Sequence, residues 1–149
     1  MSGTRRQELI YALGLGAVVA LIIGVLTHSQ GRVGFCREVL RELATGRMAV
    51  ERKIDWTQFH AVGMDVGSAY QQVATDQNRA AYKRLFIQQF AENFQKAGGR
   101  LEQFARWRVA GERDGYVIVA ADDTVHHQTL LFALPADGRK RVDAIYYWL

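Results

Sequence analysis

The chain has 149 residues, which leaves room for one apolar segment and one domain of roughly 110 to 120 residues, and none for a second independent core. Its 19 Lys and Arg against 15 Asp and Glu give a net charge of +4. The basic residues are scattered and form no recognisable nucleic-acid-binding module, so we expect no nucleic acid partner. The single cysteine, Cys36, excludes an intrachain disulfide and a cysteine metal cluster.

The first predicted element is an N-terminal membrane span. The stretch 9–26 reads LIYALGLGAVVALIIGVL, and as a helix its 18 uncharged residues would measure about 27 Å, close to the hydrocarbon thickness of a bilayer. The residues that follow, THSQGR, show no good cleavage pattern for a secretory signal. We therefore predict a retained transmembrane helix over 9–27, in preference to a cleaved signal or a buried soluble helix.

Basic residues flank both sides of this segment, so their number does not decide its orientation. The pair Arg5 and Arg6 in a short tail resembles a signal-anchor, and large carboxy-terminal domains translocate largely regardless of charge. We therefore predict a cytoplasmic tail 1–8, a single pass of the inner membrane and an extracytoplasmic domain. Within the segment, small residues recur every four positions: Ala12, Gly16, Ala20 and Gly24. This stripe predicts helix packing in lipid, against a copy of the chain or another membrane subunit.

After a linker at 28–32, the soluble part begins with helices. Apolar residues from Val33 to Thr45 follow helical spacing. In the next stretch Asp55 suits the cap of a short helical turn, and Asp65 suits the cap of a second helix that runs through Tyr70.

The longest predicted helix begins at Thr75 or Asp76 and ends at a glycine pair, with an aromatic row from Tyr82 to Phe94 that is typical of core packing. The period then changes to that of strands, and turn-like links separate four of them: 101–110, 116–121, 125–134 and 139–149. The sequence therefore predicts an α+β fold. After the transmembrane helix, one domain, 33–149, holds three helices and a curved antiparallel sheet of about four strands.

This order of elements resembles the cone-shaped, cystatin-like fold of the nuclear transport factor 2-like superfamily, which includes ketosteroid isomerase and scytalone dehydratase. The segment ATGRMAVERKIDW after the first helix is similar to a loop of that superfamily. The resemblance covers about 33–149 and implies a sheet that wraps the long helix and leaves a conical pocket. The whole layout also looks like assembly components of type IV secretion systems and membrane proteins associated with lipid-import complexes, which implies a docking or scaffold unit.

Enzymes of that superfamily use an Asp, or a His and Asp pair, in the cone. The residues of this chain that could serve there are Asp55, His60, Asp65, Tyr70 and His126. Adjacent strand residues point to opposite faces, so only one of His126 and His127 can enter a pocket. A structural histidine and a helix-capping aspartate remain open as alternatives. The sequence contains no nucleophile elbow, phosphate-cradling loop or metalloprotease motif, so we predict no catalytic residue, metal or cofactor.

We therefore predict a non-catalytic interaction or assembly module, an accessory subunit of a membrane protein complex. Its expected surface is the exposed sheet face with Ile145, Tyr147 and nearby aromatic residues, with burial of these side chains as the open alternative. The alternative is a small apolar ligand-binding protein or acid-base enzyme of the ketosteroid isomerase type, in which His126 acts with Asp55 or Asp65. A filled cone with an apolar outer sheet would favour the module, whereas a deep pocket with two or more polar side chains would favour the alternative.

Overall fold

The computed structural model describes residue 21 and residues 30–148. The chain divides into two units, Met1–Gly31 and Arg32–Leu149. This division falls inside the predicted linker, and the second unit is the folded domain.

The predicted membrane segment, 9–27, lies outside the described residues except for Leu21. The same holds for all four small residues of its stripe: Ala12, Gly16, Ala20 and Gly24. Across the described part of the chain, no helix combines the length and the apolarity that a membrane crossing requires. The prediction of a fold that includes a transmembrane helix is therefore corrected: the described elements contain none.

The domain opens with a helix over residues 30–45. Cys36, Val39 and Leu43 form its buried face, and none of them has exposed surface. Their spacing of three and four residues places them on one side of the helix. The helix ends at Gly46, whose φ of +68° is a left-handed conformation that glycine adopts without steric cost.

Four more helical segments follow in the described part of the chain. Two are α-helices, α2 (Val66–Gln71) and α3 (Asp76–Lys96), and two are 3-10 helices, η1 (Met48–Lys53) and η2 (Leu101–Gln103). The predicted cap of the second helix is confirmed, because Asp65 Oδ1 accepts a hydrogen bond from the Ser68 N–H at 3.0 Å. Thr75 caps α3 in the same way, accepting from the Asn78 N–H at 3.2 Å.

The strands form one six-stranded sheet in the order β2-β1-β6-β5-β4-β3. Their bounds are β1 (His60–Ala61), β2 (Met64–Asp65), β3 (Phe104–Arg113), β4 (Tyr116–Asp123), β5 (Gln128–Pro135) and β6 (Ala144–Trp148). All neighbouring strands are antiparallel except β1 and β6, which are parallel. The last strand therefore pairs with a segment that precedes α3 in the chain.

The prediction of about four strands in an antiparallel sheet is wrong, because the sheet is mixed and has six strands. The four predicted strands correspond to β3–β6, with 101–103 forming η2 and 125–127 and 139–143 lying outside the strands. The two additional strands contain two residues each, too few to produce an alternating pattern. Val62 and Gly63, both at positive φ, form the tight turn between them.

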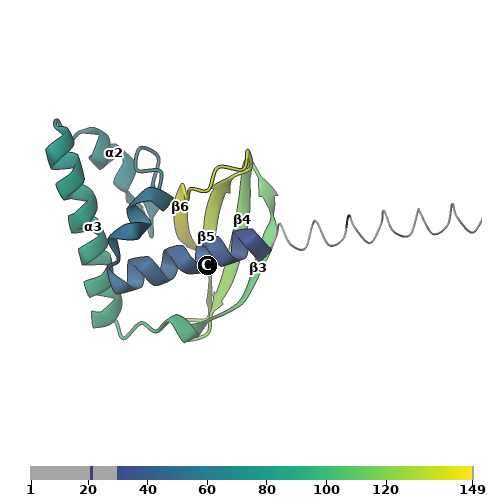
Figure 1. Ribbon diagram of the computed structural model, residues 1–149. Coiled ribbons are helices and arrows are strands. Elements are labelled where there is room, and N and C mark those ends of the chain that lie inside the picture. The colour runs from purple at the N-terminus through teal and green to yellow at the C-terminus, as the bar shows by residue number, and fades with distance from the viewer. Residues whose placement is uncertain (1–20, 22–29, 149) are drawn as a thin grey trace, which may run out of the picture. The chain divides into compact units, whose positions relative to one another are not determined.

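Helix 30–45 lies across one face of the sheet, the inner face (Figure 1). On that face Phe132 stands between Val119 and Ile145 in the strand register, and all three are fully buried. The resemblance to the cone-shaped superfamily implied that the long helix would occupy this place.

Instead, α3 stands apart from β4 and β5 in Figure 1 and packs against the segment that follows η1. It reaches the first residue of β3, where the rings of Phe94 and Phe104 lie 6.5 Å apart. The ring of Phe86 lies 5.6 Å from that of Trp56 and 5.8 Å from that of Phe59. The aromatic row of α3 is thus core packing, as its spacing predicted, but it packs on aromatic rings and not on the middle of the sheet.

Candidate interaction surface and polar pockets

The face of the sheet opposite helix 30–45, which we call the outer face, carries a band of apolar side chains. Leu131 and Tyr146 lie directly opposite each other on β5 and β6, and Ile118 and Trp148 lie on the same side of the sheet. Trp148 is 61% exposed and the other three are half-buried. In Figure 1 the described helices gather on the inner side. We refer to these four residues as the apolar band.

The sequence had indicated a sheet surface with Ile145 and Tyr147, and this choice is off by one residue. Ile145 is only 1% exposed and faces the core, while the Tyr147 hydroxyl donates a hydrogen bond to the buried Asp123. Because side chains alternate along a strand, the neighbours Tyr146 and Trp148 take the outer face.

At one end of the outer face, a pocket of about 400 Å³ contains the carboxylate of Asp143. Its lining comprises Gln58, His60, Tyr116, Ala133, Asp143 and Ala144. Asp143 is 5% exposed, and its Oδ1 has no hydrogen-bond partner among the described residues. A buried oxygen without a donor is costly, most of all when it is charged. We refer to this site as the Asp143 pocket.

The surroundings of Asp143 oppose its ionisation. Burial raises the pKa of Asp143 and the nearby Asp55 carboxylate raises it further, whereas a hydrogen bond with Tyr116 and the charge of Arg139 act in the opposite direction. Burial, together with Asp143, also raises the pKa of the Tyr116 hydroxyl.

The backbone fixes Asp143 in this position. Its N–H donates to the Ala133 carbonyl at 2.9 Å, and its carbonyl accepts from the His60 N–H at 3.0 Å. The backbone of Asp143 is therefore held between β5 and β1.

The carboxylate of Asp122, at the other end of the outer face, has cationic partners. Arg106 Nε lies 2.6 Å from Asp122 Oδ2, and Arg108 Nη1 lies 3.2 Å from Asp122 Oδ1. Burial opposes ionisation, but Arg108 and Arg106 outweigh it and lower the pKa of Asp122. A groove of about 430 Å³ adjoins this cluster. Because the two arginines already neutralise the Asp122 carboxylate, this carboxylate does not favour the binding of a further cation in the groove.

Asp123, on the inner face, has all the donors that a carboxylate can use. Its Oδ1 accepts from Gln103 Nε2 and from the backbone N–H groups of Val125 and His126 at 3.0 to 3.1 Å. Its Oδ2 faces the His126 Nδ1 at 2.8 Å and the Tyr147 hydroxyl at 3.1 Å. Burial alone would raise the pKa of Asp123, but these hydrogen bonds lower it. Burial and Asp123 together raise the pKa of Tyr147 to about 12.

The five candidate residues from the sequence do not meet in one site. Asp55 caps a turn, accepting from the Thr57 N–H at 3.3 Å and the Thr57 hydroxyl at 2.8 Å. Asp65 caps α2 and lies opposite His60 across the β1–β2 hairpin, with 3.9 Å between His60 Nε2 and Asp65 Oδ1.

Tyr70 packs beside Trp56, with 6.2 Å between their ring centroids. His126 lies in the turn before β5, more than half exposed, and binds Asp123. Of the five candidates, His60 lines the Asp143 pocket and Asp55 acts on its carboxylate.

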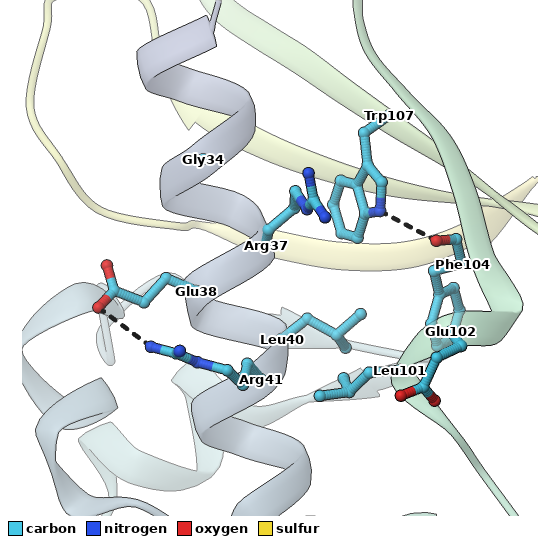
Figure 2. Close-up of a pocket in the computed structure, with 9 residues that line it drawn as sticks. All are labelled: Gly34, Arg37, Glu38, Leu40, Arg41, Leu101, Glu102, Phe104 and Trp107. Carbon is cyan, nitrogen blue, oxygen red and sulfur yellow. Dashed lines mark hydrogen bonds and ion pairs between the residues drawn. The ribbon is translucent and has the colours of Figure 1, made fainter.

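A larger groove of about 610 Å³ runs between helix 30–45 and the start of β3 (Figure 2). Figure 2 shows the Arg37 guanidinium beside the Trp107 ring, 6.0 Å from its centroid. Arg41 pairs with Glu38 at 3.6 Å. Two arginines and two glutamates line the groove, so its charges balance and select no ligand by charge.

The described residues contain no group of three His, Cys, Asp or Glu side chains that could hold a metal ion. Comparisons of the chain with protein-family models, curated proteins and solved structures found no match. The function must therefore be inferred from the chemistry of these surfaces.

Sequence reasoning missed Asp143, Asp123 and Tyr116. Asp123 had been assigned to a turn, because the pair of aspartates at 122–123 resembles one. Asp143 stands between two apolar residues near the start of a strand. Because alternation along a strand normally places such a charged residue on the solvent face, the sequence carries no signal for its burial.

Proposed function

We propose that the domain is a non-catalytic interaction module, an accessory subunit that binds another protein subunit of a membrane complex through its outer sheet face. The observation that carries this proposal is the apolar band, which includes a tryptophan that is 61% exposed. Contiguous apolar surface on a folded domain, with polar groups at its rim, is typical of protein interaction sites. Tryptophan and tyrosine often provide most of the binding energy at such sites.

The interior of the domain supports a module over a ligand chamber. Val39, Val119 and Phe132 have no exposed surface and belong to one continuous apolar core between helix 30–45 and the sheet. The space in which a cone-type enzyme would hold its substrate is thus occupied by side chains. The resemblance to the nuclear transport factor 2-like superfamily remains a proposal that rests on the order of the elements, since the mixed sheet and the position of α3 depart from the arrangement it implied.

The location that we propose is the inner membrane, with the domain on the extracytoplasmic side. This proposal is supported by the uncharged sequence 9–26 and by the two arginines before it. Of these residues, the structure describes Leu21 alone. Two proteins held in the same membrane meet at a high effective concentration, so a modest interface is sufficient.

Native mass measurement after gentle detergent extraction tests the proposal. The full-length chain should be recovered in an assembly heavier than a monomer. Trp148→Glu, which places a charge in the apolar band, should release the monomer. The matched control is Leu85→Glu, on α3, where the native side chain is 54% exposed, and this variant should leave the assembly intact.

A wild-type monomer that retains a lipid-like ligand would contradict the proposal, as would equal loss of assembly in both variants. A mass that is a whole multiple of the chain would identify the partner as a second copy.

A further inference from the structure

We propose that the Asp143 pocket receives the cationic end of a lysine or arginine side chain from the partner that covers the outer face. This inference rests on the proposed function and specifies the chemistry that the partner presents. It is carried by geometry: a carboxylate that is 95% buried lines a surface pocket, and one of its oxygens has no donor among the described residues.

The other buried carboxylates show what Asp143 lacks. Three acidic residues of the described chain are buried: Glu42, Asp123 and Asp143. Glu42 pairs with Lys53 at 3.1 Å, and Asp123 accepts hydrogen bonds on both oxygens. Buried polar groups in folded proteins are nearly always satisfied, so the exception at Asp143 indicates that its partner is supplied from outside the domain.

The charges around the pocket select a cation. Asp55 and Asp137 both disfavour the ionised form of Asp143, and Arg139 favours it. Arg139 is itself bound to Asp137, with 2.8 Å between Nε and Oδ2. These two charges cancel, which leaves the carboxylates of Asp143 and Asp55 unopposed.

The groups on the adjoining strands add no cation. His60 faces Asp65 on β2, and Tyr116 contributes a neutral hydroxyl from β4. The lining contains no Lys or Arg within the described part of the chain. An ammonium or guanidinium group in the pocket would therefore meet the Asp143 carboxylate and the Tyr116 hydroxyl, with the charge of Asp55 nearby.

The position of the pocket favours a side chain of the same partner over an unrelated small cation. Ala133 and Ala144 line the pocket, and the strand register places them in one row with Ile118 of the apolar band. The pocket and the band are thus one continuous surface. A protein seated on the band brings its own basic side chain over Asp143 without a second association event.

Titration of the full-length chain in a non-ionic detergent with acetyl-arginine amide tests this inference, with amide chemical shifts as the readout. Saturable shifts are expected at Tyr116, Asp143 and Ala144, with a Kd of about 1 to 10 mM. Acetyl-citrulline amide has the same shape without the charge and should produce no such shifts.

Two variants complete the experiment. Asp143→Asn keeps the shape of the side chain and should weaken arginine binding at least about tenfold, the equivalent of 1.4 kcal/mol. Asp76→Asn removes an equal charge from α3, where the native side chain is fully exposed, and should leave the affinity unchanged. A thermal unfolding curve for each variant establishes that it is folded.

Equal shifts with the citrulline compound would overturn the inference, and so would undiminished binding to Asp143→Asn. The absence of saturable shifts up to about 100 mM arginine amide would do the same. If the probe fails while the wild-type chain still assembles through Trp148, the cation pocket is lost and the proposed function stands.

Discussion

Two buried aspartates at opposite ends of β5 have opposite surroundings. Asp123 lies beside Gln128, the first residue of β5, on the inner face, and five donors surround its carboxylate. Asp143 binds Ala133 near the other end of β5, and its Oδ1 has no partner among the described residues. Burial disfavours ionisation at both sites, yet the pKa is lowered at Asp123 and raised at Asp143.

The difference teaches that burial alone does not tell a structural carboxylate from a functional one. What separates the two is the number of donors that the fold supplies. Asp123 ties together η2, the turn before β5 and β6, and it leaves no capacity for a ligand. Asp143 has a raised pKa, and one of its carboxylate oxygens lacks a hydrogen-bond donor beside a surface pocket. Both features are expected of a group that binds a ligand or partner.

The largest expected effect on stability comes from removing the charge of Asp123, the carboxylate that has hydrogen-bond donors on both oxygens. In Asp123→Asn, an amide NH2 replaces one of the two accepting oxygens and the buried charge that binds the five donors is lost. We therefore expect the free energy of unfolding to fall by about 3 kcal/mol. Urea unfolding at neutral pH measures this loss. Asp137→Asn, at an exposed carboxylate, is the control and should cost well under 1 kcal/mol.

Low pH should reduce the contribution of Asp123 to the stability of the fold. Because the folded pKa of Asp123 is lowered, its contribution to stability is present above the unfolded value, about pH 4, and disappears as the pH falls through the folded value. A variant whose stability matched that of the wild type would contradict the assignment of Asp123 as a structural anchor.

A smaller effect of opposite sign is expected at Asp143. Because its folded pKa is raised, the folded state binds more protons than the unfolded state between the two values, and stability falls as the pH rises through that window. Asp143→Asn should remove this fall and increase the free energy of unfolding by about 1 kcal/mol at neutral pH. Urea unfolding at about pH 4 and about pH 7 measures both changes. A variant less stable than the wild type at neutral pH would show that Asp143 is already satisfied.

Sequence patterns predicted helix 30–45, α2 and α3 because each pattern is local, but they missed the two 3-10 helices η1 and η2. The period of three to four residues in helix 30–45, the cap at Asp65 and the aromatic row of α3 all act within a few turns of one helix. The strands β4, β5 and β6 were predicted from alternation in the same way, though with shifted ends.

The parallel pairing of β1 with β6 could not be predicted, because it joins short segments about eighty residues apart. The prediction of the site failed for the same reason. Whether Asp143 or Asp123 has donors depends on groups from other strands, such as Tyr116 and Tyr147. His126 and Asp55 were visible in the sequence, but the sequence could not show that they lie in different places. The choice between Tyr146 and Tyr147 for the outer face depended on a single step of register.

The most direct test of the contrast is the pH titration of the two carboxyl groups themselves. The ¹³C shifts of the Asp123 and Asp143 side chains, followed in the full-length chain with and without acetyl-arginine amide, give both pKa values in one sample. We predict that Asp123 titrates below the ordinary value of 3.8 and Asp143 above it, and that the arginine compound lowers only the pKa of Asp143. An Asp143 that titrates below 3.8 in the free protein, or a pair that responds equally to the compound, would contradict this account.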